Sequence, residues 1–165
     1  MKILIAYATK SGTTRDAVTL LHQHLPRHEV TVADLSESTP DPTGFDHVIL
    51  GSSIRMGKAH RALRSYLDRY QAVLCTLPHS LFLCCAFSDQ FEHYLHSTFS
   101  ASLLESAAHT AYFGGELNVS RQRGLDKLLT RAMRNSILED EDDENGLPGL
   151  MPEHIRMLAD RLGGK

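Results

Sequence analysis

A chain of 165 residues fits one domain and can bury a core, and its 42% hydrophobic and 22% charged content is ordinary for a soluble globular protein. No apolar run approaches the roughly 20 residues that a membrane-spanning helix needs. The formal net charge is −3, yet residues 139–144 hold six of the 20 acidic residues, while residues 1–138 carry 14 basic against 12 acidic side chains. The body of the chain is therefore mildly basic, and the acidic stretch at 139–146 is expected to be a solvated loop.

Short apolar segments alternate with amphipathic segments along the chain. The predicted strands lie at residues 3–7, 29–33, 46–51, 81–87 and 109–115. The predicted helices lie at about residues 17–25, 63–70, 89–107, 121–138 and 152–163. Strands that read as near-unbroken apolar runs between helices indicate a parallel sheet covered on both faces, a three-layer α/β/α arrangement. No internal repeat or second domain interrupts this pattern, so residues 1–165 are predicted to form one domain.

The loop after the first strand, Thr9-Lys10-Ser11-Gly12-Thr13-Thr14, directly precedes a helix. Its hydroxyl groups and the unpaired N–H groups of the helix N-terminus favour binding of a phosphate, and Gly12 lets the backbone approach the anion. The alternative is an N-capping loop, but a cap needs one hydroxyl and this loop offers four. In a doubly wound sheet of strand order 2-1-3-4-5, ligands bind beyond the carboxyl ends of the first and third strands. This loop meets residues 52–59 and 87–89 there.

Other nucleotide-binding and metal-binding chemistries lack their motifs. The chain has no G-x-x-x-x-G-K-[ST], and no G-x-G-x-x-G follows the first strand. A phosphoacceptor response regulator needs acids where this chain has Tyr7, Ala8 and Gly51. The three cysteines, Cys75, Cys84 and Cys85, have no metal-ligand spacing and are interpreted as reduced. We predict neither a metal site nor a nucleic-acid partner.

Two segments resemble a known family. Residues 9–14 match the flavodoxin phosphate loop, T-x-[ST]-G-x-T, in the expected place after the first strand. The segment after the third strand resembles the menaquinone-dependent protoporphyrinogen oxidases, flavodoxin-domain enzymes with the pattern G-x-S-I-R-x-G-x-x-H. The matching residues are Gly51, Ser53, Ile54, Arg55, Gly57 and His60. The resemblance covers nearly the whole chain and implies a flavodoxin-like, doubly wound five-stranded parallel sheet of order 2-1-3-4-5.

The resemblance also implies FMN as the cofactor. Its phosphate would be held by Thr9, Lys10, Ser11, Gly12, Thr13 and Thr14. Its isoalloxazine ring would be wrapped by Ser52, Ser53, Ile54, Arg55, Met56 and Gly57, and closed on the other side by Phe87, Ser88 and Asp89. Flavodoxins sandwich the ring with Trp or Tyr, but this chain has no Trp. The available substitutes are Ile54, Met56, Phe87 and Tyr94.

Three functions remain open on the sequence. The first is an FMN-dependent oxidoreductase resembling protoporphyrinogen oxidase, with a quinone or porphyrinogen as substrate. The second is a flavodoxin-type electron carrier with redox partner proteins, and the third is a flavin-free interaction module. Cations at Arg55, Lys58, Arg61 and Arg64 predict a less negative potential than that of a strongly reducing carrier. No catalytic residue is assigned: His60 is the best-placed base, but histidine at a helix start is more commonly structural.

The expected location is the cytoplasm, with a peripheral position at the inner face of the membrane as the alternative. A signal peptide needs an apolar stretch of about 7–15 residues and a cleavage site, and neither follows Met1. The predicted helix at 121–138 has an apolar stripe opposite basic residues, a pattern that suits either an anionic membrane or a neighbouring protein surface. Peripheral membrane contact is therefore an open expectation.

Overall fold

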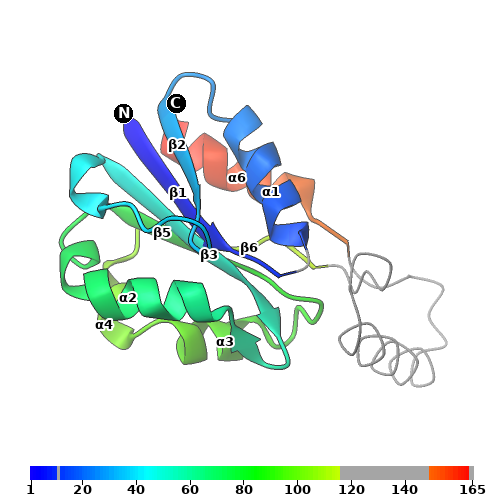
Figure 1. The fold of residues 1–165 in the computed structure, drawn as a ribbon. Coiled ribbons are helices and arrows are strands. Elements are labelled where there is room, and N and C mark those ends of the chain that lie inside the picture. The colour runs from blue at the N-terminus through cyan, green and yellow to red at the C-terminus, as the bar shows by residue number, and fades with distance from the viewer. Residues whose placement is uncertain (11, 116–148, 164–165) are drawn as a thin grey trace, which may run out of the picture.

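A computed structural model describes residues 1–10, 12–115 and 149–163. The predicted helix at 121–138 and acidic loop at 139–146 lie outside the described residues, as does Ser11. Strands and helices alternate in the described part of the chain (Figure 1). The elements are β1 (Lys2–Ala8), α1 (Thr13–Gln23), β2 (Glu29–Asp34), η1 (Pro42–Gly44), β3 (His47–Arg55), β4 (Lys58–Ala59), α2 (Arg61–Leu74), β5 (His79–Cys84), α3 (Phe91–Thr98), α4 (Ala101–Ser106), β6 (His109–Tyr112) and α6 (Pro152–Gly163).

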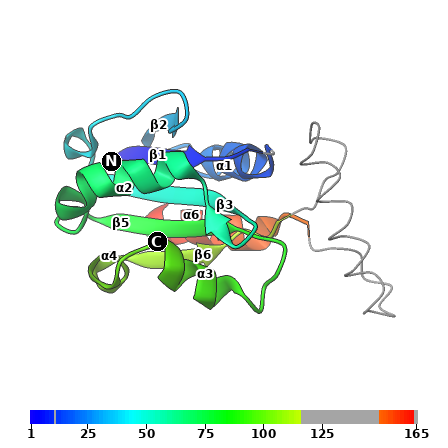
Figure 2. The same cartoon turned by 60° about the horizontal axis from the view of Figure 1, so that its bottom comes forward.

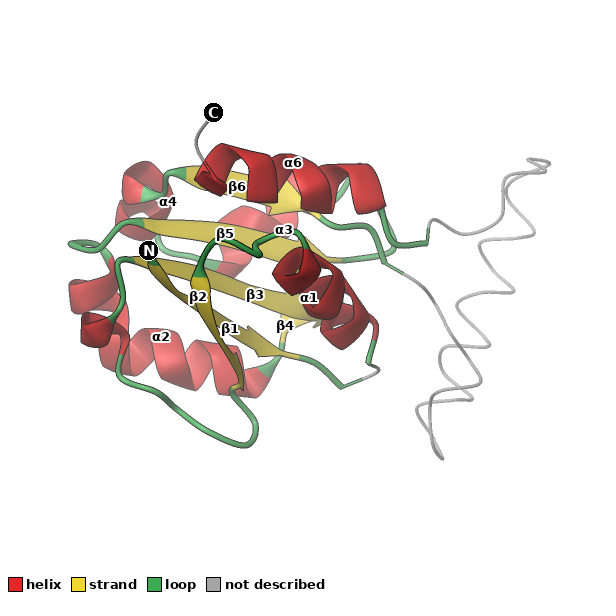
Figure 3. Cartoon of the chain, turned by 90° about the horizontal axis from the view of Figure 1, so that it is seen from above, coloured by secondary structure: helices red, strands yellow, loops and turns green. Residues whose placement is uncertain are grey.

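Five strands form a parallel sheet in the order β2-β1-β3-β5-β6. Because β4 pairs only with the end of β3, in antiparallel register, this is the predicted order 2-1-3-4-5 with one short strand added. Helices α1 and α6 cover one face of the sheet, and α2, α3 and α4 cover the other (Figure 3). The predicted three-layer, doubly wound architecture is confirmed.

The central strands are buried on both faces, which explains their continuous apolar sequences. In β1, Ile3 and Ile5 pack towards α1 and α6, whereas Leu4 and Ala6 pack towards α2. Successive side chains of a strand point to opposite faces, so a strand covered on both sides must be apolar at every position. This burial fixes the strand ends that carry the loops of the candidate site.

Several predicted boundaries are wrong. Strand β3 continues to Arg55, and what was predicted as the loop 52–59 is a β-hairpin whose turn residues, Met56 and Gly57, have φ of 49° and 73°. Both angles are positive, as in the turn that matches the twist of two-residue hairpins. Strands β5 and β6 end at Cys84 and Tyr112, earlier than predicted, where their parallel pairing ends.

The predicted helix at 89–107 is two helices, α3 and α4. Phe99 has extended φ and ψ of −111° and 142°, and its side chain is buried. The hydroxyl of Ser100 then accepts a hydrogen bond from the N–H of Leu103, which caps α4. An aromatic side chain seated in the core followed by a capping serine therefore divides the predicted helix.

The stability of the fold is expected to fall as the pH drops below about 6.5, the ordinary pKa of histidine. His47 is buried at the start of β3, and its Nε2 lies 2.9 Å from the hydroxyl of Ser80. Burial, with smaller contributions from His79 and His109, lowers the pKa of His47 to about 4. The folded state thus binds the proton less readily than the unfolded chain, and stability is lost between pH about 6.5 and about 4.

The His47→Gln variant, whose amide can reach Ser80, should lose less stability over this pH range than the wild type. Urea unfolding at several pH values measures the difference. The remaining slope is expected to include His60 and His109, whose pKa values are also lowered by burial. Equal slopes for the variant and the wild type would contradict this origin.

Candidate functional site

Three loops meet beyond the carboxyl ends of the strands. The loop after β1, the β3–β4 hairpin and the loop between β5 and α3 lie at the same end of the sheet (Figure 2). The structure therefore brings together the three segments that were predicted from the sequence to surround a ligand. The pairing Ala8↔Ser52 between β1 and β3 places the first two side by side.

The first loop ends in an open helix N-terminus. Gly12, the N-cap of α1, has φ of 92°, a left-handed conformation that glycine adopts without steric cost. Its N–H donates to the hydroxyl of Thr9 over 3.3 Å, and its carbonyl accepts from the N–H of Asp16. Gly12 has no side chain to cap the first turn, so the N–H groups that begin α1 are available to an anion.

Two threonine hydroxyls lie buried in the first turn of α1. Thr13 and Thr14 are 4% and 0% exposed, and neither Oγ1 atom makes a hydrogen bond of normal geometry. Thr14 faces the thiol of Cys84, which is a weak hydrogen-bond partner, so Thr13 is the clearer case of a hydroxyl without a partner. Burial raises the pKa of the Cys84 thiol to about 12, and the contact with Thr14 partly offsets the rise. A buried hydroxyl without a partner costs about 1–3 kcal/mol. Two at one helix N-terminus fit an anion that accepts from several donors.

The second segment is held by its own hydrogen bonds. The hydroxyl of Ser52 accepts from the N–H of His60 and donates to the carbonyl of Ser53, each over 3.0 Å. The Nδ1 atom of His60 accepts from the N–H of Ala62 over 3.2 Å and caps α2. Burial lowers the pKa of His60; Asp34 opposes this shift, and the nearby cations Lys10, Arg61 and Arg64 add to it. A neutral His60 that caps α2 therefore has a structural role.

The hairpin tip and α3 supply the apolar groups of the site. Met56 is 63% exposed at the tip of the hairpin, and α3 packs beside β4. Tyr94 of α3 lies behind the hairpin, 3.9 Å from where a Cβ on Gly57 would stand. Ile54 and Tyr94 both pack against the buried core on the α2 side. Among the candidate ring-stacking residues, Met56 is exposed, and Tyr94 lies beside the turn residue that follows it.

The third segment is a turn into α3. The carbonyl of Phe87 accepts from the thiol of Cys85 and from the N–H of Gln90. Ser88 and Asp89 are exposed beyond it, and the carbonyl of Ser88 accepts from the N–H of Phe91. Burial raises the pKa of Cys85 to about 11, so this thiol stays protonated near neutral pH.

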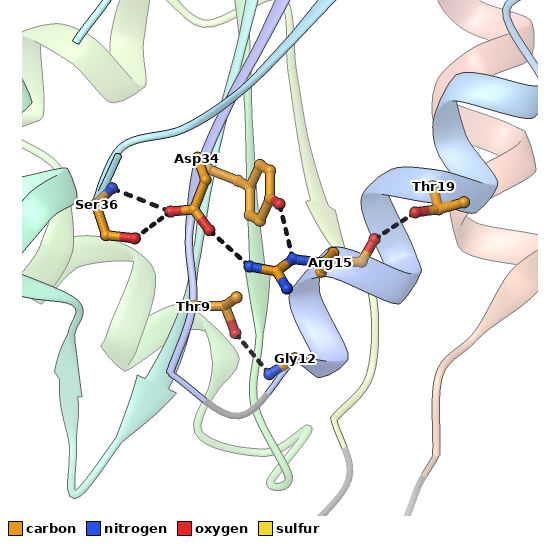
Figure 4. Close-up of polar contacts among 7 residues, drawn as sticks. Thr9, Gly12, Arg15, Thr19, Asp34 and Ser36 are labelled. Atoms are coloured by element: carbon orange, nitrogen blue, oxygen red, sulfur yellow. Dashed lines mark hydrogen bonds and ion pairs between the residues drawn. The ribbon is translucent and has the colours of Figure 1, made fainter. Parts of the chain in front are cut away.

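Sequence reasoning missed a hydrogen-bonded cluster beside the loop that follows β1. The guanidinium of Arg15 donates from Nε to the hydroxyl of Tyr7 over 3.2 Å and from Nη2 to Asp34 over 3.1 Å (Figure 4). Asp34 also accepts hydrogen bonds from the N–H and the hydroxyl of Ser36. The sequence gives no signal for this cluster, because a lone arginine on a helix is usually solvated.

A family model described as a flavodoxin domain matches residues 4–145 of the chain. The chain belongs to the flavodoxin domain family. Protoporphyrinogen IX dehydrogenase [quinone] from Escherichia coli (strain K12) is 28% identical to this flavodoxin domain over 85 residues, which are 50% of this chain and 47% of that protein. The chain therefore spans about half the length of the curated relatives it matches.

Solved structures share the fold of this flavodoxin domain. Oxidised Flavodoxin 2 from Bacillus cereus has a TM-score of 0.58 at 20% identity, over 86% of this chain and 100% of that one. Rubredoxin oxygen:oxidoreductase from Desulfovibrio gigas has a TM-score of 0.54 at 11% identity, over 99% of this chain and 37% of that one. The predicted flavodoxin-like fold is confirmed by these similarities, which at such identities concern the fold alone.

No group of three or more His, Cys, Asp or Glu side chains in residues 1–10, 12–115 and 149–163 is arranged to hold a metal ion. Among the helices of the described part of the chain, none is long and apolar enough to span a bilayer.

Proposed function

We propose that this flavodoxin domain binds FMN and acts as an oxidoreductase of the protoporphyrinogen IX dehydrogenase type. The observation that carries the proposal is the open N-terminus of α1 next to the left-handed Gly12, where the buried hydroxyl of Thr13 lacks a partner and that of Thr14 has only the thiol of Cys84. Family membership leads us to expect FMN, and this donor set fits a terminal phosphate. Bound FMN would supply the electron-transfer chemistry through its isoalloxazine ring.

The other residues would orient the cofactor. The N–H groups at the start of α1 would meet the phosphate, and the β3–β4 hairpin would lie along the ring, with Met56 and Tyr94 as its apolar neighbours. Three cations, Lys10, Arg61 and Arg64, and one anion, Asp34, act on His60, so cations outnumber anions around this residue. Such a field favours anionic partners and a reduced, negatively charged cofactor.

The capping role of His60 favours a second candidate, an electron carrier with redox partner proteins. A carrier needs no base at its cofactor, and the Nδ1 atom of His60 is already engaged with the N–H of Ala62. The cytoplasm remains the proposed location, and contact with a membrane remains a proposal that involves residues outside the described part of the chain.

These proposals are tested by a visible spectrum of the freshly purified protein. A redox titration and an anaerobic assay with protoporphyrinogen IX and menaquinone follow. The oxidase proposal predicts a yellow protein that turns over protoporphyrinogen. A yellow protein with a strongly negative potential and no turnover would favour the carrier. A colourless protein that FMN cannot reconstitute would overturn both and leave a flavin-free interaction module.

The exposed Lys58 of the hairpin is expected to raise the reduction potential of bound FMN. A unit charge in water at roughly 8 Å contributes on the order of 0.5 kcal/mol, which corresponds to about 20 mV for a one-electron couple. Lys58→Gln should therefore shift the midpoint negative by about this amount, and the shift should shrink at high salt. Arg27→Gln, beyond the other end of α1, is the matched control. An unchanged midpoint in Lys58→Gln would contradict the electrostatic argument.

A further inference from the structure

Arg15 joins three elements at the phosphate loop. It lies in the first turn of α1, directly after Thr13 and Thr14, and its guanidinium bonds to Tyr7 at the end of β1 and Asp34 at the end of β2. The two strand residues are direct partners in the parallel register, so the guanidinium bridges adjacent strands (Figure 4). A planar fork of donors suits such a bridge better than an ammonium group.

The acceptor side of this bridge is rigid. The side chain of Asp34 is 6% exposed, against 58% for Arg15, and one carboxylate oxygen is occupied by the N–H and hydroxyl of Ser36. Burial alone would raise the pKa of Asp34, but the hydrogen bonds from Ser36 and Arg15 outweigh it and hold the pKa below its ordinary value. The N–H of Leu35 also donates to the carbonyl of Tyr7 over 2.7 Å, which ties the two strand ends together.

The charges of this pair argue for a geometric role. A largely buried carboxylate beside a phosphate loop disfavours a dianion by Coulomb's law, and it neutralises the cation nearest the start of α1. Electrostatic attraction of a phosphate would therefore be stronger without Asp34. What the pair does in the structure is join the first turn of α1, which carries Thr13 and Thr14, to the ends of β1 and β2.

We propose that Arg15, held by Asp34 and Tyr7, is a positioning residue that orients the first turn of α1 for a phosphate and so gives this domain its preference for FMN over riboflavin. The inference rests on the proposed binding of FMN. On this inference, the preference for a phosphorylated flavin depends on two things. One is the set of groups that would touch the phosphate, and the other is the contact of α1 with β1 and β2.

The proposal is tested by measuring dissociation constants for FMN and riboflavin on the full chain. The variants are Arg15→Lys, Asp34→Asn, the double variant Arg15→Lys/Asp34→Asn and the control Arg27→Gln. Arg15→Lys keeps the charge and loses the fork, and Asp34→Asn removes a negative charge, so simple attraction predicts unchanged and tighter FMN binding, respectively. The positioning role predicts that each weakens FMN binding about tenfold and leaves riboflavin within about twofold. The double variant should bind FMN no more weakly than Arg15→Lys, because the contact with Asp34 is already broken in that variant.

Several results would overturn the positioning role. They are tighter or unchanged FMN binding in Asp34→Asn, wild-type FMN affinity in Arg15→Lys, an equal loss of both flavins, or additive losses in the double variant. Arg27→Gln should match the wild type, and urea unfolding of the cofactor-free proteins shows that each variant is folded. If the wild type binds FMN and the variants bind it equally well, only the positioning role is overturned. A wild type that binds neither flavin would remove the proposed function and this inference together.

Discussion

Replacing both Thr13 and Thr14 with valine is expected to weaken FMN binding by about 100-fold or more and to make the cofactor-free protein more stable. A hydrogen bond to a charged group contributes about 1.5–3 kcal/mol, and each 1.4 kcal/mol is about tenfold in affinity. In the cofactor-free protein the same hydroxyls are buried without normal partners, so their removal should stabilise the fold by about 1–2 kcal/mol. The two effects have opposite signs, which separates a binding role from general damage.

Equilibrium binding of FMN and urea unfolding of the cofactor-free protein measure these two quantities. Thr19→Val is the matched control, because Thr19 lies on the same helix, is exposed, and donates its hydroxyl to the carbonyl of Arg15. It should change FMN affinity little. Unaltered FMN binding in the double variant would remove the assignment of the phosphate to this turn.

Gly51→Ala is expected to destabilise the fold by about 3 kcal/mol, at the upper end of the usual cost of overpacking a core. A Cβ at this position would stand 2.2 Å from ring atoms of Phe82, far inside van der Waals contact. The ring has little room to withdraw, because Phe82 is fully buried and stacks on Phe113 with ring centroids 4.6 Å apart. The glycine of the G-x-S-I-R pattern is therefore required by packing in this chain.

Urea unfolding of Gly51→Ala and of Gly44→Ala measures this effect. Gly44 is the control, since a Cβ there meets nothing within 4 Å and its substitution should change stability little. Adding Phe82→Leu to Gly51→Ala should recover part of the loss, because it vacates the space that the methyl group needs. Equal stability of the two single variants would show that the ring moves aside at low cost.

A phosphate site could be predicted from the sequence because its signals are local. The hydroxyls of the first loop, the glycine at position 12 and the start of a helix are contiguous in the chain, so one segment carries the prediction of a phosphate site. The hairpin was missed for a local reason as well. Two-residue hairpin turns are usually recognised by Asn-Gly or Asp-Gly, and Met56 in a left-handed conformation gives no such warning.

The role of His60 could not be read from residue type. A histidine before a helix is compatible with a base, a solvated side chain or a cap, and only the 3.2 Å contact of its Nδ1 atom with the N–H of Ala62 distinguishes them. The same holds for Ser52, whose hydroxyl donates to the carbonyl of Ser53 and accepts from the N–H of His60. Both residues lie in the matched pattern or beside it, yet their side chains act within the protein.

By itself the sequence determined the alternation of strands and helices and hence the layers, because apolar runs and helix starts are encoded within short segments. The strand order was implied by the resemblance to flavodoxins. Only the tertiary structure decided which groups surround the loop after β1. Tyr7, Arg15 and Asp34 are separated by eight and 19 positions, and parallel pairing of β1 with β2 is what brings them within hydrogen-bonding distance. Contacts between distant segments depend on the register of the sheet, which no single segment contains.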